Sequence, residues 1–193
     1  MKKPLVLALA GLITLTVFAA GTAAKWNYDS GHQKVAFSVS HMTISDCEGY
    51  FKDVQASITA PGNDFTNAVA EMTIKANSVN TDNEKRDEHL RSADFFDVEK
   101  YPNITFKSTS FTKGKVAGQW VIVGNLTMHG VTKPVSLAAV AKTGTNPFSK
   151  KETAGFKVLG KINRKDFNLG SSTPDAIVGS SVNLAINAEF IKE

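Results

Sequence analysis

Hydrophobic and polar residues alternate with a period of two along most of the chain. The alternation is clearest in residues 35–40, 104–106, 154–162 and 182–190. Successive side chains of a strand point to opposite faces, so this pattern predicts strands with one buried face. The spacing of the intervening turns predicts about eight or nine antiparallel strands, typical of a sandwich or a closed barrel. We prefer the barrel, because a closed barrel of about eight strands can hold one small ligand.

Breaks in the alternation predict where strands bend and end. A turn is expected at residues 29–31, after a short opening strand. Residues 50–58 are expected to form one strand, with a bulge or sharp bend after Phe51. Residues 129–134 are expected to form another turn, from which the chain returns as a strand.

One stretch, residues 84–106, interrupts the strand pattern. It begins as a charged run, and residues 83–92 can form a short helix with Leu90 as its main apolar contact. The Phe95-Phe96 pair follows, and Tyr101-Pro102 stops any helix before the alternation resumes. A single helix among many strands predicts a barrel with a helical segment across its mouth.

The N-terminus has the features of a secretory signal peptide. Lys2 and Lys3 precede an uncharged apolar run over residues 5–20, and small residues follow at 22–24. The apolar run is short for a membrane span. We expect residues 1–24 to be removed by cleavage after Ala24, and the product to be periplasmic. Residues 25–193 are then about 170 residues, enough for one domain.

Charge and cysteine content exclude two classes of protein. The chain carries 22 basic and 18 acidic residues, a net charge of +4, and removal of Lys2 and Lys3 leaves +2. No basic run is interleaved with aromatic residues, so we expect no nucleic acid as a partner. Cys47 is the only cysteine. A single cysteine cannot form an internal disulfide, so stability must come from packing.

The apolar faces are rich in phenylalanine, with 12 Phe against 3 Tyr and 2 Trp. The alternation fits both an ordinary filled core and an apolar tunnel, and both alternatives stay open. A tunnel would suit an apolar ligand, because most ligand pockets are apolar with a few placed polar groups. The candidates for ligand contact are Phe37, Val39, Phe51, Leu90, Phe95, Phe96, Ile104, Phe106, Trp120, Ile122, Leu126, Met128, Phe156 and Phe167.

Three cationic side chains in the charged run are candidates for an anionic head group: Arg86, His89 and Arg91. Arginine suits phosphate because its planar fork donates two parallel hydrogen bonds. The alternative is a solvent-exposed helix face on which acidic and basic side chains pair with each other. Asp82 with Arg86, and Asp87 with Arg91, have the four-residue spacing at which side chains meet on a helix.

Signals for catalysis are weak. The four histidines are scattered without metal-ligand spacing, and no nucleophile elbow or phosphate-binding glycine loop occurs. We therefore expect no enzyme, no metal and no cofactor. The enzyme alternative would be a lipid hydrolase or isomerase, and it requires an acid–base pair such as Asp94 with His89 in a pocket.

Three longer motifs together resemble the signatures of the YceI-like family. They are RSADFFD at 91–97 followed by YPNITF at 101–106, LTMHGVTKPV at 126–135, and GKINRKDF at 160–167. The resemblance implies a lipocalin-like, extended antiparallel barrel with a helical segment at its mouth. It also implies a periplasmic or secreted protein that holds the tail of a polyprenyl phosphate or isoprenoid quinone in its tunnel. It carries over no catalytic residue.

The expected function is thus a carrier or reservoir for an isoprenoid lipid. A lipid-modifying enzyme and a structural barrel without ligand are the alternatives. The expected partner is the lipid itself. Transient contact with the membrane, or with a membrane redox or lipid partner, stays open, as does a homodimer.

Overall fold

The computed structural model describes residues 23–61 and 64–193 of the chain. Nearly all of the predicted signal peptide lies outside the described residues, and Ala24, the last residue before the expected cleavage, is the first residue of β1. Among the described residues, no helix has both the length and the apolar character needed to cross a bilayer.

Strands dominate the described chain, as the period of two predicts. The strands are β1 (Ala24–His41), β2 (Ser45–Phe51), β3 (Val54–Ala60), β4 (Val69–Lys75), β5 (Val79–Asn80), β6 (Asn103–Lys113), β7 (Gln119–Met128), β8 (Val131–Thr145), β9 (Glu152–Asn163) and β10 (Val178–Lys192). The α-helix is α1 (Glu84–Arg91), and two 3₁₀ turns are η1 (Ala76–Ser78) and η2 (Arg164–Phe167).

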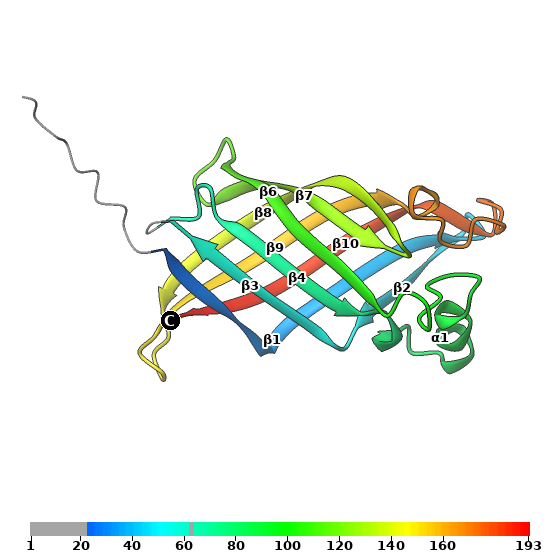
Figure 1. The fold of residues 1–193 in the computed structure, drawn as a ribbon, viewed down its shortest axis with the longest axis horizontal. Helices are drawn as coiled ribbons and strands as arrows, with labels where there is room; N and C mark the ends of the chain where they lie inside the picture. Colours follow the sequence, from blue (N-terminus) through cyan, green and yellow to red (C-terminus); the bar gives the residue numbers. More distant parts are fainter. Residues whose placement is uncertain (1–22, 62–63) are drawn as a thin grey trace, which may run out of the picture.

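Eight strands of the described chain close an antiparallel barrel. The pairing runs β10-β9-β8-β7-β6-β4-β3-β1, and β1 pairs again with β10 to complete the ring. β2 and β5 extend the sheet from the second half of β1. The barrel is elongated, and α1 lies at one end, opposite the C-terminus (Figure 1). The prediction of a lipocalin-like, all-β barrel with a helix at its mouth is confirmed.

The helix forms where the charged run predicts it. Asn83 is the N-cap, and its side chain accepts a hydrogen bond from the backbone N–H of Arg86 at 3.1 Å. This cap satisfies one of the free N–H groups at the helix start. The backbone N–H of Ser92, the C-cap, donates to the carbonyls of Glu88 and His89.

Three boundary predictions are wrong. The expected turn at residues 29–31 is part of a bulge within the continuous strand β1. The expected single strand over 50–58 is split into β2 and β3, which both pair with β1, and the split falls at the bend expected after Phe51. β8 already begins at Val131, so the turn after β7 is shorter than residues 129–134.

Pro134 explains the third error. Proline cannot donate to a ladder, so it suggests the end of a strand. In the structure Pro134 pairs with Asn125 of β7, but β8 meets its other neighbour, β9, only from Leu137 onward. Pro134 therefore lies in an edge stretch of β8, where its missing N–H costs no ladder hydrogen bond.

A cluster of aromatic rings fills the barrel end opposite α1. Phe65, from the loop between β3 and β4, contacts Trp26 at 5.2 Å, Trp120 at 6.1 Å and Phe156 at 4.9 Å between ring centroids. Phe111 packs against Phe65, Trp120 and Phe156. Edge-to-face pairs of this kind contribute about 0.5–1.5 kcal/mol each beyond area burial. We call these five side chains the aromatic plug.

Gly124 on β7 shows how large rings are fitted into the interior. A Cβ atom there would meet the ring of Phe106 and would lie 2.6 Å from the backbone oxygen of Lys107. We expect Gly124→Ala to lower the free energy of unfolding by about 1–3 kcal/mol, through overpacking. The matched control is Gly155→Ala, since a Cβ at Gly155 meets nothing within 4 Å. Urea denaturation of the two variants should separate them, and equal losses would contradict this account.

Candidate functional site

The barrel interior near α1 contains an apolar cavity, which we call the outer cavity. Its volume is about 110 Å³. Its walls come from strands, from α1 and from the segments that follow α1 and η2. The lining residues are Phe37, Val39, Phe51, Leu90, Phe95, Phe96, Met128, Ile162, Arg164, Leu169, Val178, Val182 and Leu184.

A second apolar cavity of about 80 Å³, the inner cavity, lies further along the barrel, next to the aromatic plug. It is bounded by residues from most of the closing strands, including Val35, Phe106, Phe111, Leu137, Phe156 and Ile186. Phe111 and Phe156 belong to the plug and also line this cavity. Both cavities are smaller than the engineered cavity of about 150 Å³ that binds benzene in another protein.

Two leucine side chains, Leu137 and Leu184, form a constriction between the two cavities. Leu184 lines the outer cavity, whereas Leu137 and Phe106 line the inner one. Leu137 lies directly over Gly160, and Leu184 Cδ1 is 3.7 Å from the position that a Cβ of Gly160 would take. The two leucines therefore meet over a glycine. The interior is thus neither filled from end to end nor one continuous tunnel.

The mouth of the outer cavity is built by two chain segments that are hydrogen-bonded to each other. After α1 the backbone folds back, and the N–H of Phe96 donates to the carbonyl of Leu90 at 2.9 Å. The N–H of Gly170, in the loop after η2, donates to the carbonyl of Asp94 at 3.0 Å. Gly170 has φ of +55°, and a Cβ there would lie 2.6 Å from the Phe95 ring. The glycine thus lets the two segments close over Phe95.

Arg164 holds the loop between η2 and β10 in place. Arg164 is 3% exposed, and its side chain donates hydrogen bonds to five backbone carbonyls. The acceptors are Gly179 at 3.0 Å, Leu169 at 2.8 Å, Gly170 at 2.5 Å, Thr173 at 2.8 Å and Val178 at 2.8 Å. Burial lowers the pKa of this guanidinium, and the nearby charge of Asp175 acts in the opposite direction. A buried charge is tolerated here because its donors are paired.

The two arginines predicted to bind a head group connect α1 to the segment before it. Arg86 donates to the side-chain and backbone oxygens of Thr81 at 2.8 and 2.7 Å. Arg91 donates to the backbone oxygens of Asn77 and Val79 at 3.0 and 3.3 Å. The alternative pairs, Asp82 with Arg86 and Asp87 with Arg91, are absent from the ion pairs of the described residues. A head-group role for these arginines stays a prediction.

His89, the third head-group candidate, lies close to the mouth. Its ring packs edge-on against Phe95 at 5.1 Å, and its Nε2 is 3.2 Å from Oδ2 of Asp94. The two side chains are 60% and 70% exposed. This is the pair on which the enzyme alternative depended. It does form, but it lies in solvent and lines neither cavity, so the enzyme alternative loses its specific support.

The structure gathers most of the predicted ligand contacts around the two cavities. Phe37, Val39, Phe51, Leu90, Phe95, Phe96 and Met128 line the outer cavity, and Phe106, Ile122 and Phe156 line the inner one. Four more are buried but line neither: Ile104, Trp120, Leu126 and Phe167. Contact of any of them with a ligand stays a prediction.

Sequence reasoning missed part of the outer cavity wall. The missed residues are Ile162, Arg164, Leu169, Val178, Val182 and Leu184. The alternation in β10 could have selected Val182 and Leu184, because Phe37 and Val39 face them directly across the β1–β10 pairing. Leu169 lies in an irregular loop and has no periodic signal.

The fold and the three motifs agree with a family comparison. The family model of the YceI-like domain matches residues 26–190. This chain belongs to the YceI-like family. Protein YceI of Salmonella newport strain SL254 is 38% identical over 195 residues, covering 100% of both chains.

Three solved structures are similar in fold to this chain. The YceI protein of Campylobacter jejuni has a TM-score of 0.70 and 32% identity, with 80% of this chain and 90% of that chain covered. Burkholderia cenocepacia BcnA has a TM-score of 0.75 at 22% identity, covering 84% and 99%. A polyisoprenoid binding domain from Saccharophagus degradans has a TM-score of 0.64 at 17% identity, covering 89% and 99%. The last two likenesses concern the fold alone.

Proposed function

We propose that this protein is a periplasmic carrier that binds an isoprenoid lipid, a polyprenyl phosphate or an isoprenoid quinone, with its tail in the barrel. The observation that carries the proposal is the outer cavity. Apart from the hydrogen-bonded Arg164, its lining side chains are all apolar. A solvated or charged substrate would find no polar partner on such a wall, whereas a hydrocarbon tail needs none.

Hydrocarbon burial is sufficient to drive the binding. Each buried CH₂ contributes about 0.8 kcal/mol, so one five-carbon unit contributes roughly 3 kcal/mol before ordering costs. The cavities of about 110 and 80 Å³ hold only the first part of a long tail. A longer tail enters when Leu137 and Leu184 rotate and join the two cavities. The proposed class of ligand is the one named for the polyisoprenoid binding domain of Saccharophagus degradans, which has a similar fold.

Mass spectrometry of co-purified lipid tests the ligand. The full chain is expressed with its own N-terminus in a Gram-negative bacterium, and purified protein is extracted with organic solvent. We expect an isoprenoid chain in an amount comparable with the protein. Repeated purification without bound lipid would overturn the proposal. The intact mass of the periplasmic product tests the predicted export and cleavage site, since cleavage after Ala24 leaves Lys25 as the first residue.

Leu137→Ala tests the role of the constriction. Leu137 is 7% exposed, so the change should cost about 2–5 kcal/mol of stability. It should also join the cavities and shift the co-purified lipid toward longer tails. Leu126→Ala is the matched control, because Leu126 is equally buried at 7% and lines neither cavity. An identical tail-length distribution in the two variants would contradict a gating role for Leu137.

A further inference from the structure

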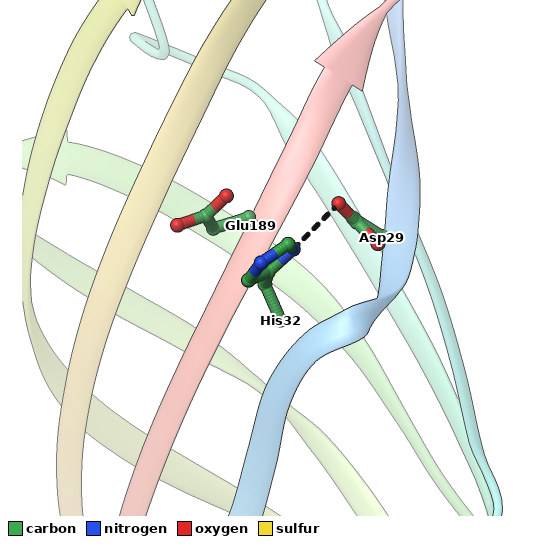
Figure 2. Close-up of side chains that lie close together, drawn as sticks. All are labelled: Asp29, His32 and Glu189. Atoms are coloured by element: carbon green, nitrogen blue, oxygen red, sulfur yellow. Dashed lines mark hydrogen bonds and ion pairs between the residues drawn. The ribbon is translucent and has the colours of Figure 1, made fainter. Parts of the chain in front are cut away.

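A bulge in β1 creates a cluster of ligand-type side chains on the barrel wall. Asp29 pairs with Glu189 of β10, and pairing resumes with Gln33 opposite Ala188. Residues 30–32 therefore have no partner on β10. The extra residues bring His32 back beside Asp29, and Figure 2 shows the three side chains grouped over the β1–β10 pair.

Hydrogen bonds already orient two of the three side chains. Oδ1 of Asp29 accepts a hydrogen bond from the backbone N–H of Gly31 at 2.9 Å. This contact leaves Oδ2 to face Nδ1 of His32 at 3.0 Å. A ligand carboxylate that is itself hydrogen-bonded is a common feature of metal sites, because the bond fixes its direction.

Glu189 places a second carboxylate on the same face. Residues directly opposite each other on antiparallel strands share a face, and like charges in such a pair are destabilising. A cation beside the two carboxylates would offset this repulsion.

We propose that Asp29, His32 and Glu189 form a surface binding site for a divalent transition-metal ion of the Zn²⁺ type. One ligand atom from each residue lies within 4.8 Å of the others. With metal–ligand distances of about 2.0–2.2 Å, two donors 3.0 Å apart subtend about 90° at the metal, as chelating neighbours do. An oxygen of Glu189 lies within 4.8 Å of both donors, and rotation of its side chain would bring that oxygen to the third position. One imidazole with two carboxylates suits Zn²⁺, Co²⁺ or Ni²⁺ better than Mg²⁺ or Ca²⁺, which prefer oxygen ligands alone.

The site is exposed and leaves coordination positions free. The His32 side chain is 69% exposed and that of Asp29 is 27% exposed. His32 and Glu189 also line an open groove that contains Lys142 and Lys157. Three protein ligands beside an open groove fit an exchangeable ion rather than a closed structural site. None of the three residues lines the outer or inner cavity, so this site is independent of the proposed lipid binding.

The chain contains a built-in control for this proposal. His89 and Asp94 also form an exposed imidazole–carboxylate pair, at 3.2 Å. In the part of the chain that the structure describes, that pair has no third ligand residue within reach, whereas the Asp29 cluster has Glu189. If binding requires three ligands, loss of His32 should weaken it and loss of His89 should not.

Isothermal titration of the untagged protein with Zn²⁺ tests the site. We expect one saturating ion per chain. His32→Ala and Glu189→Gln should each weaken binding by about 10-fold or more, and His89→Ala should leave it unchanged. Zn²⁺ should also raise the melting temperature of the wild type, and this rise should be lost in Glu189→Gln, because an ion bound only to the folded state stabilises it.

Several results would overturn the proposal. One is the absence of saturable binding up to about 1 mM Zn²⁺, where the binding free energy is near 4 kcal/mol. Others are equal affinities for the wild type and His32→Ala, or loss of binding in His89→Ala instead. Circular dichroism of each variant confirms that it is folded, which the high exposure of His32 favours.

Discussion

Arg164→Met should lower the free energy of unfolding by about 3–5 kcal/mol, the largest loss we expect from a single polar residue here. Methionine keeps the apolar stem but removes every donor that now pairs with the five backbone carbonyls of the loop after η2 and the start of β10. Unpaired buried carbonyls cost about 1–3 kcal/mol each unless water reaches them. Arg164→Lys should recover little, because one ammonium cannot span five acceptors in the geometry of a planar fork.

Urea denaturation followed by tryptophan fluorescence measures this loss. Lys165→Met is the control from the neighbouring position, since Lys165 is 39% exposed and makes only a surface ion pair with Asp175. That control should change stability by no more than about 0.5–1 kcal/mol. Hydrogen exchange should accelerate in residues 168–179 of Arg164→Met. Stability and exchange both equal to the control would show that Arg164 does not hold the loop.

Val182→Phe should abolish lipid loading while the protein stays folded. Val182 lines the outer cavity and pairs with Val39 and Ile162, which line it too. A phenylalanine ring would occupy the space that the first isoprenoid unit needs. Losing that unit, worth roughly 3 kcal/mol, should lower the lipid-to-protein ratio by at least about 10-fold. Stability should change by less than about 1.5 kcal/mol, because the new ring fills an existing cavity.

The matched control makes the same substitution outside the barrel. Val121 on β7 is 38% exposed and lines neither cavity, so Val121→Phe should leave lipid loading unchanged. Quantitative mass spectrometry of extracted lipid compares the two variants, and circular dichroism checks that both are folded. Wild-type lipid content in Val182→Phe would place the ligand somewhere other than the outer cavity.

The metal-ion site and the lipid cavity use opposite faces of the same strands. On β10, Val182 and Leu184 line the outer cavity, while Glu189 belongs to the surface cluster with Asp29 and His32. The two proposals can therefore fail separately. Loss of Zn²⁺ binding in His32→Ala should leave lipid content unchanged, and Val182→Phe should leave Zn²⁺ binding unchanged.

Local patterns in the sequence were sufficient to predict the strands and the helix, and they left a sandwich as the alternative to the preferred barrel. The alternation of apolar and polar residues is a local property, because successive side chains of a strand point to opposite faces. The helix at 84–91 follows from its own polar run and from the cap at Asn83. The motifs around Phe95 and Pro134 indicate the YceI-like family without any information on contacts. Predictions failed where a second strand decided the outcome, as for Pro134, whose edge position depends on where β9 begins.

Only the tertiary structure decided what the inward faces enclose. The alternation places Leu137 and Leu184 inside, but their meeting over Gly160 depends on the register between strands. Arg164 finds three of its acceptors in a loop that has no periodic pattern and two at the start of β10. Asp29 and Glu189 are 160 positions apart and become neighbours only through the pairing of the first strand with the last. The sequence by itself thus determined which face each residue takes, because that choice is local, whereas cavities, constriction and cluster arise from strand register, which is set by contacts across the whole barrel.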